Sequence, residues 1–301
     1  MRLACTAPAL FAMVLSACAA RPFDVTPPLY TAAAQTPTQP RTITFLLPGA
    51  LTTAEIFRPA QDWAGPEHLV VEYRLPGMQG QPVSPGLDVQ RSAGWVADYA
   101  NRYPDARINL LGYSTGAAIA LEAAWRISDG KRVTVAAVSS PTPFPGAILA
   151  ALRGGVTVAA GAVRIGSLEK QAIWEEYYKT LYLGTGWRKM PEKRAMANRL
   201  EDILLGRVVA PGEGKGRAQS GSLLFWTLSP QATGTQARIA FFHGARDPVF
   251  PPSGAERLAR RFDAALCLLP EDGHLVFQSN SDILMRIGSY FAAEGDSGPC
   301  G

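Results

Sequence analysis

The sequence predicts an α/β fold: a mostly parallel, doubly wound sheet that carries an inserted helical cap. From residue 41 onward, short apolar runs alternate with helix-like stretches, a pattern typical of parallel strands covered by helices on both faces. The alternation breaks between residues 141 and 236, where we expect the cap. A chain of 301 residues has room for one large domain of this kind or for two smaller ones.

The predicted core comprises residues 41–140 and 237–301. Its apolar runs are the expected strands: Ile43–Leu47, Leu69–Tyr73, Ile108–Leu111, Val133–Val138, Ile239–Phe242 and Ala265–Leu269. Its expected helices are Val89–Arg102, Gly116–Ile127, Ser253–Phe262 and Asp282–Ala292. Ligands of parallel sheets collect at the carboxyl ends of the strands, so polar residues directly after these runs are the first candidates for a site.

The predicted cap, residues 141–236, holds two expected helices, around Ser167–Leu183 and Pro191–Leu205. Residues 153–217 carry twelve Lys or Arg against seven Asp or Glu, while the whole chain has a net charge of only +4. This basic region could lie near anionic lipid headgroups or steer acidic substrates, and a solvated basic face is the commoner explanation. A row of four aromatic residues and one leucine at helical spacing favours a helix that packs on the sheet domain over an acyl-binding wall: Trp174, Tyr177, Tyr178, Leu181 and Tyr182.

The N-terminal region is expected to lie outside the fold. Residues 1–17 combine one positive side chain, an apolar stretch and small residues, the pattern of a secretory signal. "LSAC" at Leu15–Cys18 resembles the lipobox of bacterial lipoproteins, which implies lipidation of Cys18 and, with Ala19 next, an outer membrane location facing the periplasm. The alternative is a plain secretory signal and a secreted or periplasmic protein. Residues 18–40 are rich in Pro, Ala, Thr and Gln and are expected to form a flexible tether.

Cys267 and Cys300 are the cysteines of the predicted core. In an oxidising compartment they can form a disulfide that fastens the tail to the last strand, and the alternative is one buried and one free thiol. The sequence has no Cys/His cluster that would hold a metal ion, so we expect neither a metal nor a cofactor. The mild charge, without a long basic run, gives nucleic-acid binding little support.

The stretch "INLLGYSTGAAIALEAA", which starts at Ile108, places Ser114 between a predicted strand and a predicted helix. A serine hydroxyl is a poor nucleophile until a base takes its proton, and its attack on a carbonyl also needs donors for the oxyanion. The G-x-S-x-G spacing supplies the geometry, because side chains at Gly112 or Gly116 would crowd the sharp turn. The amide of Thr115, first in the helix, is expected to face the oxyanion.

The base is sought among three histidines. His68 precedes an apolar run and therefore lies at the amino edge of the sheet. His243 ends a strand and is expected to pack beside the strand end. His274, in "LLPEDGHLVF", follows the last apolar run at the carboxyl edge, and we predict that it is the base.

The base needs a carboxylate that orients it and stabilises its charged form. Asp247, in "HGARDPVFP", lies just past a strand end at the same edge and is the predicted acid. Asp272 is too close to His274 in sequence, and Glu271 and Asp98 are the fallback candidates.

The second oxyanion donor is expected after the first strand of the core, in "TFLLPGALTTAEIF". A Pro48–Gly49 turn there is followed by the amides of Ala50 and Leu51, and Ala50 is the preferred donor.

These motifs resemble those of the α/β-hydrolases, of the serine esterase and lysophospholipase kind, from about Arg41 to the C-terminus. "GYSTG", "HGARDPVFP" and "DGHLVF" correspond to that family's nucleophile elbow, acid loop and histidine loop, in the family's chain order. Pro48–Gly49 replaces the family's usual His-Gly, but backbone amides do the work at this loop.

The resemblance implies a serine hydrolase that cleaves acyl esters, among them lysophospholipids, at the bacterial cell envelope. An acyltransferase or thioesterase with the same triad and a catalytically inactive binding lipoprotein are the alternatives. A halide or epoxide hydrolase is disfavoured, because such enzymes would want Asp at position 114.

Overall fold

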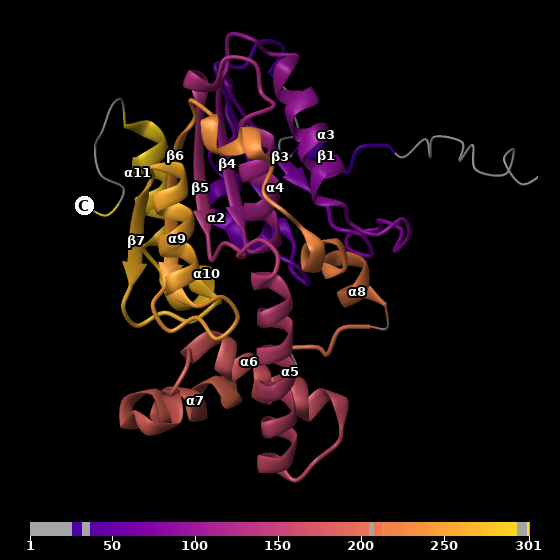
Figure 1. Cartoon of the computed structure of the whole chain (residues 1–301), viewed down its shortest axis with the longest axis vertical. Helices are drawn as coiled ribbons and strands as arrows, with labels where there is room; N and C mark the ends of the chain where they lie inside the picture. Colours follow the sequence, from indigo (N-terminus) through magenta and orange to yellow (C-terminus); the bar gives the residue numbers. More distant parts are fainter. Residues whose placement is uncertain (1–25, 32–36, 205–207, 213, 294–299, 301) are drawn as a thin grey trace, which may run out of the picture.

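The computed structural model describes residues 26–31, 37–204, 208–212, 214–293 and 300. Seven strands form one sheet in the order β1-β3-β2-β4-β5-β6-β7, and every neighbouring pair is parallel except β1 and β3 (Figure 1). The strands are β1 (Leu29–Thr31), β2 (Thr42–Leu47), β3 (His68–Tyr73), β4 (Arg107–Tyr113), β5 (Val133–Val138), β6 (Arg238–Gly244) and β7 (Ala265–Leu269). The predicted α/β fold class and its parallel sheet are confirmed.

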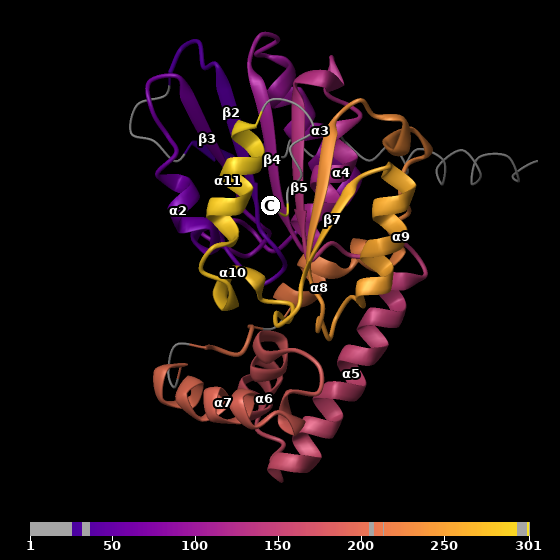
Figure 2. The same ribbon diagram turned by 90° about the vertical axis from the view of Figure 1, so that its left-hand side faces the viewer.

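Helices cover both faces of the sheet (Figure 2). On one face lie α3 (Val89–Asn101), α4 (Thr115–Ala124) and α9 (Pro252–Phe262); on the other lie η2 (Ala54–Phe57), α2 (Arg58–Gln61), α10 (Val276–Ser279) and α11 (Ile283–Ala292). A short turn of 3-10 helix, η3 (Gly130–Arg132), precedes β5. Since side chains alternate along a strand, Phe45 and Leu47 of β2 enter one core while Leu46 enters the other.

The chain between β5 and β6 forms a helical insert, which corresponds to the predicted cap. It contains α5 (Gly146–Ile165), α6 (Lys170–Leu183), η4 (Trp187–Lys189), α7 (Pro191–Leu204), α8 (Lys215–Ser220), η5 (Ser222–Phe225) and η6 (Pro230–Gly234). α5, α6 and α7 extend beyond the end of the sheet, at the bottom of Figure 1. The insert is fastened to α4 by the buried Glu122 carboxylate, which accepts hydrogen bonds from the Trp226 indole (3.0 Å) and the Ser229 amide (2.9 Å).

The sequence predicted α6 and α7 of the insert but did not predict its other two α-helices, α5 and α8. The sequence of α5 mixes Gly and Val, both unfavourable in helices, with Ala and Leu, and its few polar residues outline no polar face. α8 spans only six residues and follows a Gly-rich segment typical of a loop.

The predicted tether, residues 18–40, needs one correction. Within it, Leu29–Thr31 form β1, which pairs with the edge strand β3. The Arg74 guanidinium lies 3.8 Å from the centre of the Tyr30 ring, and Pro28 accepts a hydrogen bond from the Arg74 amide (2.9 Å). Three residues between Pro-rich stretches are too few to show strand alternation in the sequence. The signal-like segment and Cys18 lie outside the described residues.

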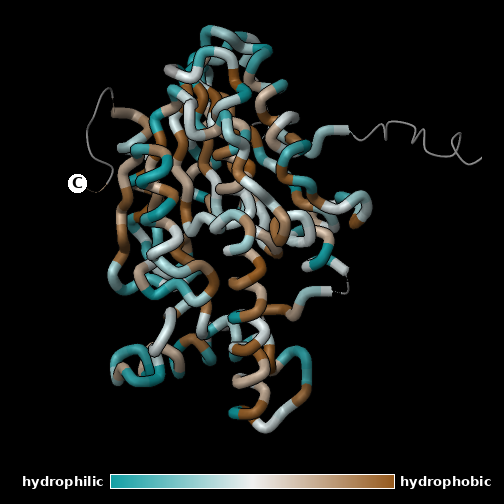
Figure 3. Tube along the Cα trace, viewed as in Figure 1, coloured by the Kyte–Doolittle hydropathy of each residue, from teal (hydrophilic) through white to brown (hydrophobic). Residues whose placement is uncertain are grey.

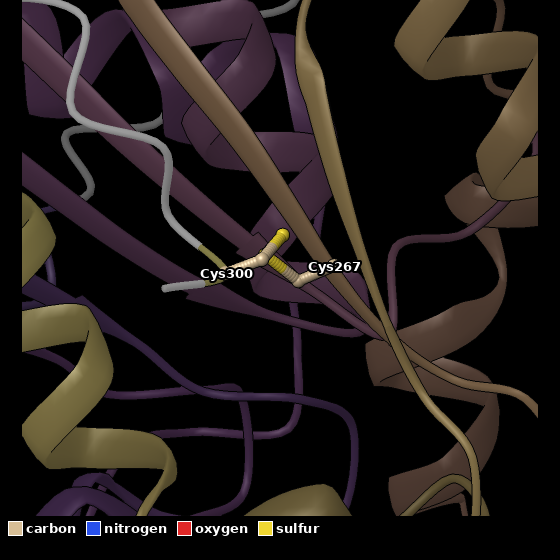
Figure 4. Close-up of a disulfide and its surroundings, with 2 residues drawn as sticks. All are labelled: Cys267 and Cys300. Carbon is tan, nitrogen blue, oxygen red and sulfur yellow. A yellow bond between two sulfur atoms is a disulfide. The ribbon is translucent and has the colours of Figure 1, made fainter.

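The order of the strands places the site candidates. From β2 the chain steps to β3 on one side and returns to β4 on the other, so a topological switch point lies at the carboxyl ends of β2 and β4. At the far edge of the sheet, Cys267 of β7 forms a disulfide with Cys300, which holds the end of the chain against the last strand (Figure 4).

Candidate active site

Ser114 occupies the tight turn between β4 and α4. Its backbone has φ +49° and ψ −120°, a region that non-glycine residues rarely adopt, and its side chain is largely buried. The Ser114 amide donates a hydrogen bond to the Val138 carbonyl at the end of β5 (2.9 Å). The strained turn therefore presents the hydroxyl at the carboxyl end of the sheet, beside the switch point.

The two glycines of the turn are required by close backbone contact. A Cβ atom at Gly112 would lie 2.6 Å from the Gly116 carbonyl oxygen, and one at Gly116 would overlap the carbonyl oxygen of Leu47. Real side chains do not make such contacts, so the strand, the helix and the neighbouring β2 can approach only because both positions lack a side chain.

Ser114, His274 and Asp247 form one chain of hydrogen bonds. His274 Nε2 lies 3.2 Å from Ser114 Oγ, and His274 Nδ1 lies 2.8 Å from Asp247 Oδ2. Asp247 Oδ1 accepts hydrogen bonds from the Val249 amide (2.7 Å) and the Phe250 amide (3.0 Å), so that both oxygens of the carboxylate are engaged. The three predicted side chains therefore meet, although they come from three loops far apart in the sequence.

The charges of this chain follow from its donors and acceptors. Burial alone would raise the pKa of Asp247, but the attraction of His274 and its hydrogen bond, together with His243 and the Phe250 amide, outweigh burial and hold that pKa below its usual value. An ionised carboxylate can only accept, so His274 Nδ1 carries a proton, and the Nε2 atom of the neutral ring is left to accept the Ser114 hydroxyl proton.

Two buried hydroxyls hold the backbone of His274 from the core side. The Tyr113 and Ser139 hydroxyls donate to the His274 carbonyl, at 3.2 Å and 3.0 Å. The Tyr113 ring lies 5.5 Å from the imidazole, and burial, followed by the charge of Asp247, raises the pKa of Tyr113 well above its usual value. The Tyr113 hydroxyl therefore stays a protonated donor.

The insert holds the same loop from the other side. The carbonyl of Leu181, near the end of α6, accepts hydrogen bonds from the His274 amide (2.8 Å) and the Leu275 amide (3.3 Å). A Cβ atom at Gly273 would overlap the Leu181 carbonyl, so the glycine before His274 is what permits this approach. The Thr185 amide also donates to the carbonyl of Arg246, directly before Asp247 (2.8 Å).

Lys193 of α7 fastens this contact. Its buried ammonium donates to the carbonyls of Leu183 (2.9 Å) and Glu271 (2.5 Å) and lies 3.5 Å from the Glu271 carboxylate. One cation thus joins the end of α6 to the loop that carries His274. Nothing in the sequence around Lys193 marks this role, because its main partners are backbone carbonyls.

The loop after β2 approaches Ser114, as predicted for an oxyanion donor. A Cβ atom at Gly49 would lie 3.0 Å from the Ser114 Cβ, which places the backbone of this loop directly beside the serine. Within the described residues, no hydrogen bond outside the helices and strands uses the amide of Ala50 or Thr115, and the first amide of a helix has no partner inside its own helix. Both amides are therefore available as donors.

Gln219 of α8 shapes this loop and was not foreseen. Its fully buried side chain accepts a hydrogen bond from the Leu51 amide (2.6 Å) and donates to the Pro76 carbonyl (2.6 Å). Leu51 has φ +63°, which is unfavourable for a residue with a side chain, and the Gln219 amide group holds it there. Leu51 is thus occupied, which leaves Ala50 as the donor that the loop can offer.

The remaining histidines lie as predicted. His68 begins β3 and so lies at the amino ends of the strands, opposite the carboxyl ends that carry the site. It hydrogen-bonds Thr44 Oγ1 (2.8 Å). His243 is buried in β6, and its Nε2 contacts the Phe250 carbonyl (2.8 Å) and lies 3.6 Å from Asp247 Oδ2. Burial lowers the pKa of His243, so the neutral ring supports the Asp247 loop.

Asp272, which was set aside as the acid, and the fallback candidates Glu271 and Asp98 take no part in the chain of hydrogen bonds through His274. Asp272 accepts from Ser279 Oγ (2.6 Å) and Asn280 Nδ2 (2.9 Å), and the Glu271 carboxylate pairs with Lys193. Asp98 belongs to α3, away from the carboxyl edge. Among the described residues, no group of three or more His, Cys, Asp or Glu is placed to hold a metal ion.

Most of the aromatic row of α6 packs on the core. Tyr178 Oη donates to Gln278 Oε1 (2.6 Å), Tyr182 Oη donates to the Gln278 carbonyl (3.0 Å), and Leu181 is buried. Tyr177 packs against the same core, and burial, followed by the charge of Asp247, raises its pKa to about 12. Trp174 lies against the Tyr177 ring, with 5.9 Å between ring centres.

Solved structures similar to this chain show the same fold. BpoC from Mycobacterium tuberculosis H37Rv, a candidate non-heme bromoperoxidase, is 14% identical with a TM-score of 0.66 over 89% of this chain and 96% of that one. A thermophilic esterase from Thermogutta terrifontis is 18% identical (TM-score 0.56; 88% and 92% covered). The esterase EaEST from Exiguobacterium antarcticum is 16% identical (TM-score 0.59; 88% and 96% covered).

No curated protein sequence matches the chain. The family model described as "Alpha/beta hydrolase family" matches residues 44–286, which include the strand–turn–helix of Ser114 and the loops of Asp247 and His274. That match spans most of the chain and agrees with the sheet order and the strand-end site. The chain therefore belongs to the alpha/beta hydrolase family.

Proposed function

We propose that the protein is a serine hydrolase that cleaves carboxylic acyl esters through an acyl-enzyme. The observation that carries this proposal is the unbroken chain from Ser114 Oγ through His274 to Asp247 Oδ2, at 3.2 Å and 2.8 Å. A structural serine would need neither a strained turn nor a buried, carboxylate-bound imidazole beside it.

The first half of the reaction acylates Ser114. Oγ attacks the ester carbonyl carbon while its proton moves to His274 Nε2, and the carbonyl electron pair moves onto oxygen. The amides of Ala50 and Thr115 donate to that oxyanion, and Asp247 stabilises the imidazolium. When the carbon–oxygen bond to the alcohol breaks, His274 returns the proton to the leaving oxygen.

The second half releases the acid. Water attacks the acyl carbon, gives its proton to His274, and the Ser114–acyl bond breaks as Ser114 Oγ recovers a proton. An alcohol or thiol in place of water would make the same site an acyltransferase, and a thioester substrate would make it a thioesterase. Esterases among the solved structures with this fold support the ester substrate.

The proposed location is the cell envelope. Cys18 lies outside the described residues, and its lipobox-like setting supports lipid attachment and an outer membrane location facing the periplasm. A Cys18→Ser variant expressed in a bacterial host should lose the palmitate that the wild type incorporates. A secreted or periplasmic protein would show no difference between the variant and the wild type.

Labelling with a fluorophosphonate probe tests the proposed activity. We expect labelling of the wild type, none of Ser114→Ala, and labelling slowed by a factor of about 10³ or more in His274→Ala. Hydrolysis of an acyl ester series, including lysophospholipids, should follow the same order. A folded wild type that neither labels nor turns over any ester, thioester or acyl acceptor would instead support an inactive binding lipoprotein.

A further inference from the structure

α5 is the helix of the insert with the least cover. It has twenty residues, of which only Ala147, Ala150 and Gly161 are buried. Within the described parts of the chain, it alone among the helices is long and apolar enough to cross a membrane. An apolar helix in water is normally covered, so its uncovered face indicates a partner.

The uncovered residues of α5 lie on one stripe. Leu149, Leu152, Val156 and Val163 are spaced three, four and seven residues apart, which places them on one face of a helix, and their exposed fractions rise from 47% through 62% and 70% to 84%. The opposite face is occupied, because Gly154 and Gly161 lie against Tyr177 and Glu176 of α6. The stripe therefore faces away from the protein.

Apolar residues extend this stripe at both ends. Phe144 precedes the helix and is 49% exposed, and Leu168 follows it and is 91% exposed. Phe225 is also exposed. It lies near Phe144, because the Phe144 amide donates a hydrogen bond to the carbonyl of Trp226, the residue after Phe225 (2.8 Å). Figure 3 shows apolar colour along the end of α5 that lies farthest from the sheet. We call Phe144, Leu149, Leu152, Val156, Val163 and Leu168 the α5 face.

Charged side chains are few along α5 itself, and the exposed acid Glu169 directly follows the last residue of the α5 face. Residues 141–168 contain no Asp or Glu, and their two charged side chains are Arg153 and Arg164. Arg153 is exposed on α5, and Arg164 pairs with Glu176 at 2.8 Å while its side chain stays 44% exposed. An apolar stripe with the exposed Arg153 beside it suits the boundary between acyl chains and anionic headgroups.

From this combination we propose that the α5 face binds the surface of a phospholipid bilayer that contains anionic lipid. α5 lies in the plane of that surface, because its start is joined to β5 and its inner face is packed along α6. A two-fold contact between copies would place α5 against α5 and would bring the exposed Arg153 of each copy beside the apolar face of the other.

Vesicle binding tests the proposal. The chain that begins at Ala19 keeps every described residue and lacks the lipidation site, so its binding reports on the fold. We expect it to sediment with vesicles of phosphatidylcholine and phosphatidylglycerol and to bind phosphatidylcholine vesicles more weakly. Leu152→Glu should weaken binding about tenfold or more, and Leu152→Glu with Val163→Glu should abolish it.

Met285→Glu is the matched control, because Met285 on α11 is 67% exposed and Leu152 is 62% exposed. It should bind within about twofold of the wild type, since one added charge far from the contact is largely screened. Urea unfolding and fluorophosphonate labelling check that each variant is folded. The proposal is overturned if the wild type does not bind, if Leu152→Glu binds as the wild type does, or if Met285→Glu is weakened equally.

Sedimentation velocity addresses the other occupant. A wild type that is dimeric without lipid, and monomeric after Leu152→Glu, would assign the α5 face to a second copy and also overturn the proposal.

Discussion

The two sides of the Ser114–His274 hydrogen bond are built in different ways. Ser114 is fixed by its own turn, by glycines two residues away on either side, and by the ends of the neighbouring strands. His274 is fixed by Tyr113 and Ser139 of the core and by Leu181 and Lys193 of the insert. Ser114 is therefore held by the sheet and the start of α4, whereas His274 is held also by the insert, which is thus part of the site and not a detachable cover.

Among substitutions on the Ser114 side of the site, Gly116→Ala should have the most severe effect. The new Cβ would overlap the Leu47 carbonyl, so β2 and α4 must separate, and we expect a loss of more than about 3 kcal/mol in the free energy of unfolding. Gly155→Ala on α5 is the control, since nothing lies within 4 Å of its added Cβ. Urea unfolding measures both, and equal stability of the two variants would contradict the packing described for the turn.

Asp247→Asn affects the His274 side by replacing the carboxylate that His274 Nδ1 contacts. The amide cannot stabilise the imidazolium or hold Nδ1 protonated as a carboxylate does, so kcat should fall by a factor of about 10⁴. Asp272→Asn removes a carboxylate that touches Ser279 and Asn280 but not His274, and its effect should be far smaller. Steady-state ester hydrolysis compares the two, and equal losses would mean that Asp247 is not the acid.

Lys193→Met loosens the contact between the insert and the histidine loop. We expect kcat to fall about tenfold with little change in KM, because the base is displaced while the substrate contacts stay in place. Among the described residues, the Lys179 ammonium pairs with Glu176 and Glu201, and Lys179→Met should leave kcat within about twofold. Partial recovery of kcat in Lys193→Arg would support the view that the charge at residue 193 positions His274. A drop in the KM of Lys193→Met with kcat unchanged would argue against it.

The smallest expected effect is on acid stability. The pKa of Asp247 is lower in the folded protein than its ordinary value, so its ionised form stabilises the fold above that value and this contribution fades as pH falls through the folded pKa. The difference in unfolding free energy between the wild type and Asp247→Asn should therefore shrink between about pH 5 and about pH 2. A difference that grows as the pH falls would mean that the pKa of Asp247 is raised, not lowered, in the folded protein.

The strands and the site candidates could be read from the sequence because each carries a local signature. The six parallel strands are apolar runs, and Ser114, Asp247 and His274 each follow such a run, which places them at one edge. The disulfide was one of two alternatives for Cys267 and Cys300, and only the structure, which joins the two residues, distinguishes them.

The contacts of the insert could not be read in the same way. Leu181 acts through a backbone carbonyl, which every residue possesses, and Lys193 and Gln219 bind carbonyls and an amide that leave no trace in sequence spacing. α5 lacks helical alternation because its outer face is as apolar as its inner one. The apolar outer face of α5 is therefore both the reason why the sequence pattern did not predict this helix and the basis of the proposed lipid contact.

Hydrogen exchange at the two sides of the site tests most directly whether the insert holds the base. The amides of residues 112–118 and 271–276 would be followed in the wild type and in Lys193→Met. The structure predicts faster exchange at residues 271–276 of the variant, where the His274 amide is bonded to Leu181, and unchanged exchange at residues 112–118. Unchanged exchange in both segments, or equal acceleration in both, would contradict the separate construction of the two sides.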